Sequence, residues 1–279
     1  MPNQPLVSVC IPVFNGEKFL KETIDCVLNQ TYKNIELVFS DNYSTDNTVE
    51  IINSYKNDRI KLFKNQTNEG IYNNYVKVLK LGTGKYITFL GADDLMDFTC
   101  VEKSVKLLEE DSSLVLINTH IQIINDMGEK VYTKKYFFGS GKLNRYWAIR
   151  ANLFYGSNLL GEPNGSLFLK SAFDKIPEPL FSNSNNWTFD IDMKLELILQ
   201  GETFMIPEPL GYFRISSNST SKKLPIFTQS RLFRKYAYNL YKDKRYNLSF
   251  FWVITATVNS IILEIARNIF YKLFIKNHY

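Results

Sequence analysis

The stretch GKYITFLGADDLMD, residues 84–97, determines the fold we expect. Residues 86–90 are β-branched, aromatic or aliphatic and lie between two glycines, which is typical of a strand covered on both faces. Asp93 and Asp94 follow, beyond the carboxyl end of that strand, where open α/β sheets bind ligands. Adjacent carboxylates repel each other unless a cation or a proton intervenes, and Mg²⁺ and Mn²⁺ bind both such oxygens and phosphates. The stretch indicates a metal-bridged phosphate site or, equally well, a polar turn before a helix that begins near Phe98.

Strand and helix signals alternate on both sides of this stretch. Expected strands cover residues 6–12, 35–39 and 60–63, and expected helices cover residues 17–30, 72–81 and a segment from Ser44 or Thr45 to residue 55. Helices of this length between strands imply parallel pairing with right-handed crossovers. The sequence therefore predicts a doubly wound, mostly parallel α/β sheet with flanking helices.

In such a sheet, the loops after successive strands open on one edge. That edge would collect polar residues from four loops: Phe14 with Asn15, Asp41, residues 68–70, and Asp93 with Asp94. A nucleotide could lie across them, with a base N–H donating to Asp41. The chain has neither GxGxxG after its first strand nor GxxxxGK[ST], so a metal rather than a glycine-rich loop would hold the phosphates.

Composition limits the classes of protein that the chain can represent. Its 279 residues are 45% hydrophobic and 15% aromatic, enough for one large domain or a domain with an appendage. The three cysteines, Cys10, Cys26 and Cys100, lack metal-ligand spacing, which favours free thiols in a reducing compartment. No signal peptide is expected, because no basic segment precedes the first strand. The net charge of +5 is too small to indicate a nucleic-acid partner.

Three ordered motifs closely resemble the inverting nucleotide-sugar glycosyltransferases of family 2, which have the GT-A fold. They are VSVCIPVFNGEKFLKETIDCVLNQTYKNIELVFSDNYSTDNT from residue 7, NEGIYNNY from residue 68 and TGKYITFLGADD from residue 83. The resemblance extends from residue 6 to about residue 212. It implies that Asp41 contacts the nucleotide base, Asp93 the ribose and Asp94 a divalent metal, Mg²⁺ or Mn²⁺. Gly91 stands where many members carry a further aspartate. Further implied contacts to the nucleotide sugar are Pro12, Phe14, Asn15, Asn74 and Arg214.

A second informative stretch is WTFDIDMKLELILQGE, residues 187–202. A helix over residues 191–200 would place Asp190 at its N-terminal end, where the helix dipole favours a carboxylate, so capping alone would explain this residue. The family has a Glu-Asp pair here whose aspartate is the catalytic base, which implies that role for Asp190. Phe189 replaces the usual glutamate, and Asp192 is expected to be a carboxylate of the first helical turn.

A third match is GYFRISSNSTS from residue 211, which resembles the family segment YR-x-H-x-x-S-x-S. Arg214 would contact the diphosphate or else be a surface charge at a strand end. Ser216 stands where many members have a histidine.

The intervening region is less regular. Residues 114–118 are expected to form a strand, and residues 120–124 and 130–133 a hairpin. His120 is interpreted as a structural or surface residue, because no other candidate ligand is spaced to join it. The aromatic residues among the glycines and asparagines of residues 137–167 would stack on sugar rings or pack a small core.

The last fifty residues lie outside the resemblance. Residues 231–246 predict a basic amphipathic helix, with six basic side chains against one acid, Asp243. Residues 248–266 approach membrane-spanning length, but Asn259 and Glu264 make a span costly. We expect an interfacial or core-packed helix pair, or helices that simply cover the catalytic domain. Deleting residues 231–279 is expected to leave a soluble catalytic domain.

Together these features predict three regions: a nucleotide-sugar-binding half (1–118), an acceptor-binding half of the same GT-A domain (119–222) and a C-terminal helical extension (223–279). The expected protein is a metal-dependent inverting hexosyltransferase, cytoplasmic and peripheral at the inner face of the cell membrane. It would transfer sugar to a glycan or polyprenyl-linked acceptor in capsule, O-antigen or exopolysaccharide synthesis. The alternatives are a nucleotidyltransferase, or an inactive sugar-nucleotide-binding or membrane scaffold protein.

Overall fold

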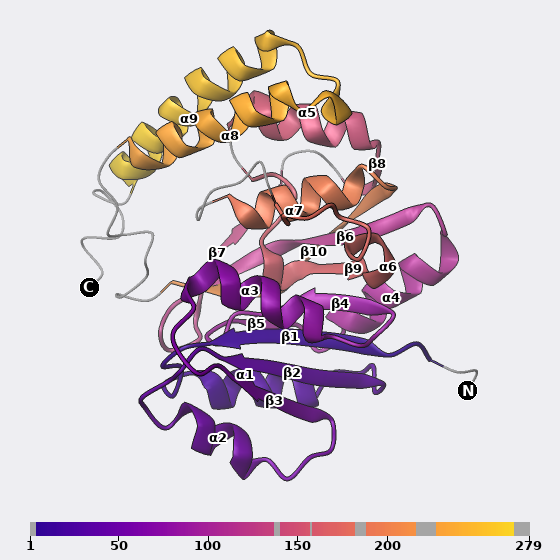
Figure 1. The fold of residues 1–279 in the computed structure, drawn as a ribbon, viewed down its shortest axis with the longest axis vertical. Helices are drawn as coiled ribbons and strands as arrows, with labels where there is room; N and C mark the ends of the chain where they lie inside the picture. Colours follow the sequence, from indigo (N-terminus) through magenta and orange to yellow (C-terminus); the bar gives the residue numbers. More distant parts are fainter. Residues whose placement is uncertain (1–3, 137–139, 157, 182–187, 216–226, 271–279) are drawn as a thin grey trace.

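The computed structural model describes residues 4–136, 140–156, 158–181, 188–215 and 227–270 (Figure 1). Within these residues the strands form one ten-stranded sheet in the order β3-β2-β1-β4-β9-β6-β10-β5, with β7 beside β6 and β8 beside β10. The strands are β1 Val7–Val13, β2 Ile35–Asp41, β3 Ile60–Lys64, β4 Tyr86–Phe89, β5 Leu95–Met96, β6 Leu114–Ile124, β7 Lys130–Lys134, β8 Gly141–Leu143, β9 Ser166–Leu169 and β10 Glu202–Arg214.

The first four strands pair in parallel, as the sequence predicts. β9 then enters antiparallel between β4 and β6, and β10 pairs parallel to β6. The helices are α1 Leu20–Leu28, α2 Thr48–Ser54, α3 Gly70–Leu81, α4 Cys100–Glu110, α5 Arg145–Tyr155, α6 Lys170–Phe173, α7 Phe189–Ile198, α8 Thr228–Lys242 and α9 Phe250–Phe270, with short 3₁₀ turns at Pro163–Gly165 (η1) and Lys244–Tyr246 (η3). The expected α/β fold with flanking helices is confirmed.

Each face of the sheet supports a separate core. Successive side chains of a strand point to opposite faces, so Val9 of β1 packs with α1 and α4, whereas its neighbour Cys10 packs with α3. Both faces of β1 and β2 are therefore buried, which explains their nearly continuous apolar sequence. Cys10 and Cys100 are buried and Cys26 is half-buried, all as free thiols.

Several expected boundaries differ from the observed ones. The strand of residues 114–118 and the first hairpin strand are one continuous strand, β6, and His120 lies buried within it, where its Nδ1 accepts from the Tyr136 N–H. α2 begins at Thr48 rather than near Thr45, because Asp46 accepts from the backbone N–H of Thr48. α7 begins at Phe189, two residues before the expected start, so Asp190 is inside its first turn.

The C-terminal helices belong to the main core. Figure 1 shows α5, α8 and α9 together at one end of the molecule, with α7 between them and the sheet. Phe233 and Leu240 of α8 and Ala256 of α9 are buried in the same cluster as Leu195 of α7. This packing argues against the expectation that deleting residues 231–279 leaves a soluble catalytic domain, because deletion would expose this cluster to water. No helix among the described residues is both long and apolar enough to cross a membrane.

Candidate active site

A cavity of about 330 Å³ lies at the carboxyl ends of β1 and β4. Pro12 borders it from the end of β1 and Phe14 from just after that strand, Asn74 borders it from α3, and Asp94 and Asp190, the expected metal ligand and the expected base, border it as well. The other residues of its wall are Val13, Asn42, Ile71, Tyr75, Phe89, Glu162, Pro163, Phe189 and Phe213. The fold thus brings five of the nine predicted site residues to one cavity. The other four predicted residues are not part of its wall and lie on the neighbouring loops and strands: Asn15, Asp41, Asp93 and Arg214.

Asn15 and Asp41 order the loop after β2. The Asn15 side chain accepts from the Thr45 N–H at 2.8 Å, and its backbone has a positive φ of 52°. Asp41, which is almost fully buried, accepts from the Ser44 N–H at 3.3 and 3.4 Å. Both side chains therefore fix the shape of this loop, and the contact of Asp41 with a nucleotide base stays a prediction.

Asn74 ties α3 to the sheet. Its Oδ1 accepts from Ser40 Oγ at 2.6 Å and from Asn65 Nδ2 at 3.2 Å, and its Nδ2 donates to the Ser40 carbonyl at 2.9 Å. This buried amide uses its hydrogen-bonding groups within the protein, so it fixes the cavity wall.

Asp93 and Asp94 turn their carboxylates toward the same space over Gly91. A Cβ built on Gly91 would lie 2.8 Å from Asp94 Oδ2 and 3.1 Å from Asp93 Oδ1. Burial, and next the negative charge of Asp93, raise the pKa of Asp94 well above its usual range. A cation between the two carboxylates would relieve both effects.

These oxygens fit Mg²⁺ or Mn²⁺, which bind through one or two carboxylates and complete their coordination with water and phosphate oxygens. Among the residues described, no group of three histidine, cysteine, aspartate or glutamate side chains could hold a metal. Metal binding by Asp94, with Asp93 adjacent, stays a prediction. Ser216, which stands where many family members have a histidine, lies outside the described residues.

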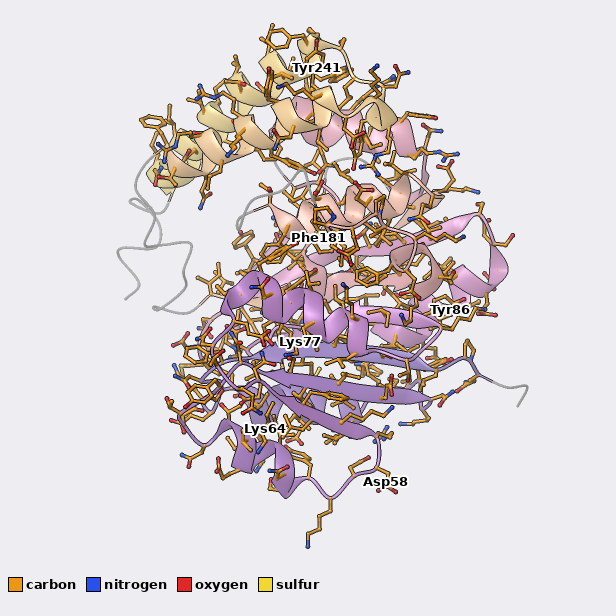
Figure 2. All side chains as sticks on the ribbon, in the orientation of Figure 1. Asp58, Lys64, Lys77, Tyr86, Phe181 and Tyr241 are labelled. Atoms are coloured by element: carbon orange, nitrogen blue, oxygen red, sulfur yellow. The ribbon has the colours of Figure 1, made fainter. Side chains whose placement is uncertain are left out.

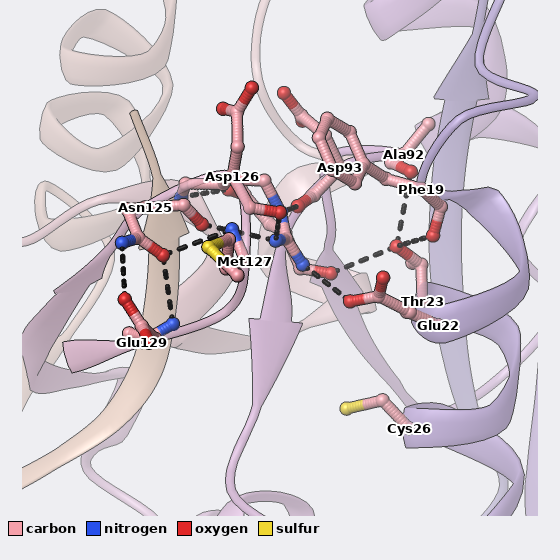
Figure 3. A network of polar contacts seen from close by, with 12 residues as sticks. Phe19, Glu22, Thr23, Cys26, Ala92, Asp93, Asn125, Asp126, Met127 and Glu129 are labelled. Atoms are coloured by element: carbon pink, nitrogen blue, oxygen red, sulfur yellow. Dashed lines mark hydrogen bonds and ion pairs between the residues drawn. The ribbon is translucent and has the colours of Figure 1, made fainter. Parts of the chain in front are cut away.

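Arg214 supports the acidic loop from within the protein. Figure 3 shows several of the residues that it contacts, among them Asp93, Asp126 and Glu22. Its backbone N–H donates to Asp94 Oδ1 at 2.9 Å, and its side chain has no exposed area. The guanidinium donates to the carbonyls of Asp93, Asn125 and Asp126, forms a 2.7 Å ion pair with Glu22 and lies 4.2 Å from the Phe19 ring centroid. The observed contacts hold the loop in place, and the diphosphate contact of Arg214 stays a prediction.

Asp190 faces the cavity from the first turn of α7. Burial first, and the charge of Glu162 second, raise its pKa to about 6, while the Lys194 ammonium acts in the opposite direction. An ionised carboxylate with a pKa near 6 is suited to accept a proton at neutral pH.

Phe189, in place of a glutamate, anchors the start of α7. Its ring meets Tyr75 edge-on at 4.6 Å between centroids and Tyr72 at 5.9 Å, both on α3. The substitution therefore adds an aromatic contact between the two helices that border the cavity.

Sequence reasoning missed Glu162 and Lys194. Glu162 lies in the loop before η1 and forms a 2.6 Å ion pair with Lys134 of β7. Burial acts to raise the pKa of Glu162, but the ammonium groups of Lys134 and Lys194 hold it below its usual range. Glu162 stands in a glycine-, asparagine- and aromatic-rich segment without periodicity, so the only local signal was the pair of glycines that flank EPN.

A second cavity, of about 460 Å³, adjoins the first. Glu162, Asp190 and Phe213 border both, and the wall opposite is formed by α8 and α9, including Phe233 and Leu263. Asp190 thus stands where a cavity on the Asp94 side meets a cavity beneath the C-terminal helices. This arrangement can receive two substrates on either side of one carboxylate.

Comparison with known sequences gives a consistent result. The family model described as Glycosyl transferase family 2 matches residues 8–177. An uncharacterized glycosyltransferase of Haemophilus influenzae is 27% identical over 226 residues, 79% of this chain and 69% of that protein. WfaP of Escherichia coli, a UDP-Glc:alpha-D-GlcNAc-diphosphoundecaprenol beta-1,3-glucosyltransferase, is 37% identical over 106 residues, 38% of this chain and 42% of that protein. The chain thus spans about two thirds of the first relative and less than half of the second.

Solved structures show the same fold. Staphylococcus aureus TarS 1–349, in complex with UDP-GlcNAc, superposes with a TM-score of 0.70 at 16% identity, covering 97% of this chain and 76% of that one. The mannosyltransferase PcManGT of Pyrobaculum calidifontis, with GDP-Man and Mn²⁺, superposes with a TM-score of 0.60 at 13% identity, covering 95% and 76%.

Proposed function

The chain belongs to glycosyl transferase family 2, and from this premise we propose that it is an inverting glycosyltransferase that uses a nucleoside diphosphate sugar. The acceptor would be a hydroxyl of a glycan or lipid-linked saccharide in surface polysaccharide synthesis. One observation carries the proposal: the Asp93-Asp94 loop and the buried carboxylate of Asp190 reach the same cavity, through Asp94 and Asp190. Two proteins of the same fold, solved in complex with UDP-GlcNAc and GDP-Man, are compatible with a nucleotide-sugar donor.

In the proposed reaction, an acceptor hydroxyl attacks the anomeric carbon from the face opposite the diphosphate. The new bond from carbon to the acceptor oxygen forms as the bond to the diphosphate oxygen breaks, so the configuration inverts. Asp190 takes the hydroxyl proton, and the nucleoside diphosphate leaves with the bonding electrons. Asp190 borders both cavities, which is the position that a base between donor and acceptor requires.

The donor would be held by this chain's own residues at the carboxyl ends of β1, β2 and β4. Asp41 would accept from the base, Asp93 from the ribose hydroxyls, and Pro12 and Phe14 would line the nucleotide pocket. Mg²⁺ or Mn²⁺, held by Asp94, would neutralise the charge of the departing diphosphate.

We also propose that the protein binds peripherally to the inner face of the cell membrane. α9 exposes a row of apolar side chains, among them Phe251, Ile254 and Ile262, each more than half exposed. α8 places Arg234 and Lys235 at the rim of an apolar groove of about 440 Å³ between the two helices. A basic rim around an apolar face complements an anionic lipid surface. The lipid-linked substrate of WfaP is compatible with this location.

Transfer activity provides the first test. We expect release of nucleoside diphosphate from a UDP- or GDP-sugar with Mn²⁺, and a glycoside whose anomeric configuration by NMR is opposite to that of the donor. Asp190→Asn keeps the size of the side chain but removes the proton acceptor, so turnover should fall roughly 10²–10⁴-fold. Asp58→Asn, on an exposed turn (Figure 2), is the control and should be fully active.

Three outcomes would contradict the proposal. Near-normal turnover of Asp190→Asn would exclude Asp190 as the base, and a retained configuration would exclude inversion. Release of pyrophosphate in place of nucleoside diphosphate would indicate a nucleotidyltransferase.

A further inference from the structure

Lys194 is a lysine with no exposed area on α7, one helical turn after Asp190. Its ammonium nitrogen lies within hydrogen-bonding distance of five groups that can accept. They are the carbonyls of Leu160 (2.9 Å), Gly161 (2.6 Å) and Glu162 (3.3 Å), Ser166 Oγ (2.7 Å) and Asn118 Oδ1 (3.2 Å). Because an ammonium has three protons and no lone pair, this set of acceptors suits the charged form.

These contacts connect four parts of the molecule. Three successive carbonyls come from the loop that carries Glu162, while Ser166 begins β9 and Asn118 lies in β6. Residues four apart share one face of a helix, so Lys194 and Asp190 lie on the same side of α7. The loop of Glu162 and the helical turn of Asp190, which border both cavities, are therefore fixed to a single buried group.

The charges around Lys194 are balanced. Asp190 is four residues earlier on the same helix, Glu162 is in the loop whose carbonyls accept from Lys194, and Lys134 of β7 pairs with Glu162 at 2.6 Å. Burial lowers the pKa of Lys194 to about 7, and the two carboxylates act to raise it. Lys134 pairs with Glu162. Of the two lysines in this group of four charged residues, Lys194 is therefore the one left to balance the charge of Asp190.

We propose that Lys194 is a positioning residue for glycosyl transfer: its buried ammonium holds residues 160–162 against the turn of Asp190 and supplies the counter-charge that this carboxylate needs inside the protein. The inference rests on the proposed function, because Asp190 is the base only in that reaction. It assigns a role to a residue for which neither the sequence patterns nor the resemblance gave one.

Lys194→Met keeps most of the side-chain length and removes the charge. In protein labelled at the aspartate carboxyl carbon, we expect NMR titration to show the pKa of Asp190 raised, because removing a nearby opposite charge disfavours the ionised carboxylate. Asp190→Asn identifies the signal. The exposed Lys175→Met carries the same change in net charge and should leave the titration unchanged. No substrate is required.

Two further variants separate charge from folding. Glu162→Gln removes a negative charge and should move the pKa of Asp190 in the opposite direction, downward, which shows that the labelled signal responds to charges around it. In Asp190→Asn the pKa of the unmutated Lys194, read at its labelled ε-carbon, should fall, because coupling between two sites is reciprocal. This reading needs no change at Lys194 and decides the question even if Lys194→Met does not fold.

An unshifted Asp190 titration in folded Lys194→Met, or an unshifted Lys194 titration in Asp190→Asn, would overturn the inference. If both shifts appear while no nucleotide sugar is turned over, the electrostatic coupling stands and the proposed function fails. In an active enzyme, the acid limb of the pH profile of kcat/KM should move upward with the Asp190 pKa, and the turnover lost at neutral pH should return at higher pH.

Discussion

At the residue scale, the acidic loop depends on Gly91 and Arg214. Gly91 leaves room for the two carboxylates to approach over its backbone, and Arg214 holds Asp94 and the Asp93 carbonyl from below. A third aspartate at position 91 would place its Cβ 2.8 Å from Asp94 Oδ2. The departure from the family motif thus allows the two remaining carboxylates to converge, and does not by itself remove a cation site.

The metal prediction belongs to this scale. We expect calorimetry to show that UDP or GDP binds with Mn²⁺ present and only weakly with excess chelator, because the diphosphate would otherwise approach two uncompensated carboxylates. Asp94→Ala should lose the metal dependence together with most of the affinity, and Asp58→Ala should keep both. Equal affinity of the unmutated protein with chelator and with metal would contradict the assignment.

The contribution of Asp190 to the stability of the folded protein depends on pH. Its pKa is raised in the folded protein, to about 6, so between pH 4 and 6 the folded state binds more protons than the unfolded state at this group. The contribution of Asp190 therefore becomes less favourable as pH rises through this range. Asp190→Asn does not ionise, so we expect it to be more stable than the unmutated protein at pH 8, by roughly 1–3 kcal/mol at about 1.4 kcal/mol per pKa unit.

Thermal unfolding of the two proteins at pH 4 and pH 8 checks this expectation. The stability difference should shrink toward pH 4, where the unmutated carboxyl is protonated in the folded state. A stability difference that is the same at both pH values would show that the pKa of Asp190 is not raised by folding, and one that falls toward pH 8 would show that it is lowered.

At the scale of elements, α8 and α9 each present two different surfaces. Their inner sides enter the core through Tyr236, Ala237 and Ala256, while the outer sides expose basic and apolar groups, including Tyr241 (Figure 2). Glu264 of α9 is buried and accepts from the Ser230 N–H at 2.9 Å, which satisfies an N–H in the first turn of α8. Glu264, the acidic residue that makes a membrane span costly, therefore lies between α8 and α9 and accepts a hydrogen bond there.

The outer surface predicts lipid binding. In flotation with phosphatidylglycerol vesicles at low salt, we expect the unmutated protein to bind and to dissociate as salt rises, because exposed charges are screened. Changing Arg231, Arg234 and Lys235 together to Gln should weaken binding at least tenfold, at about 1 kcal/mol per basic residue.

The matched control changes Lys56, Lys64 and Lys106 to Gln, three exposed lysines on other elements, and should bind like the unmutated protein. Equal loss in both triple variants would show attraction by net charge alone. No binding of the unmutated protein at low salt would assign the helix pair a structural role only.

At the scale of the whole molecule, the helix pair and the sheet share one core. Arg245, after α8, pairs with the buried Glu196 of α7 at 2.7 Å, and Tyr246 donates to the same carboxylate at 3.1 Å. Removing residues 231–279 would leave Glu196 without these partners and uncover the cluster around Leu195. We expect the truncated chain to accumulate as insoluble protein, or to unfold at a temperature at least 10 °C lower by circular dichroism. A truncated chain that melts at the same temperature as the full chain would show that the sheet and α7 fold independently of α8 and α9.

Local sequence determined the first half of the fold and the residues of the expected chemistry. Apolar runs such as residues 86–90 form strands because their pattern is local, and the carboxyl ends of parallel strands necessarily share an edge, so Phe14 and Asp94 reach one cavity. The role of Asp190 came from the family resemblance, and the structure places it on that cavity. The division of the chain at residues 118 and 222 stays a prediction.

Tertiary structure alone decided the surroundings of these residues. Glu162 and Lys194 have no periodic or motif signal, and the motif that contains Arg214 did not predict its observed contacts. The partners of these three residues lie between 28 and 192 positions away along the chain. Burial and charge at Asp190 likewise depend on a loop and a strand from elsewhere in the chain. The free energy of a buried charge depends on everything packed around it, so the chain could indicate the carboxylates, while the fold set their protonation.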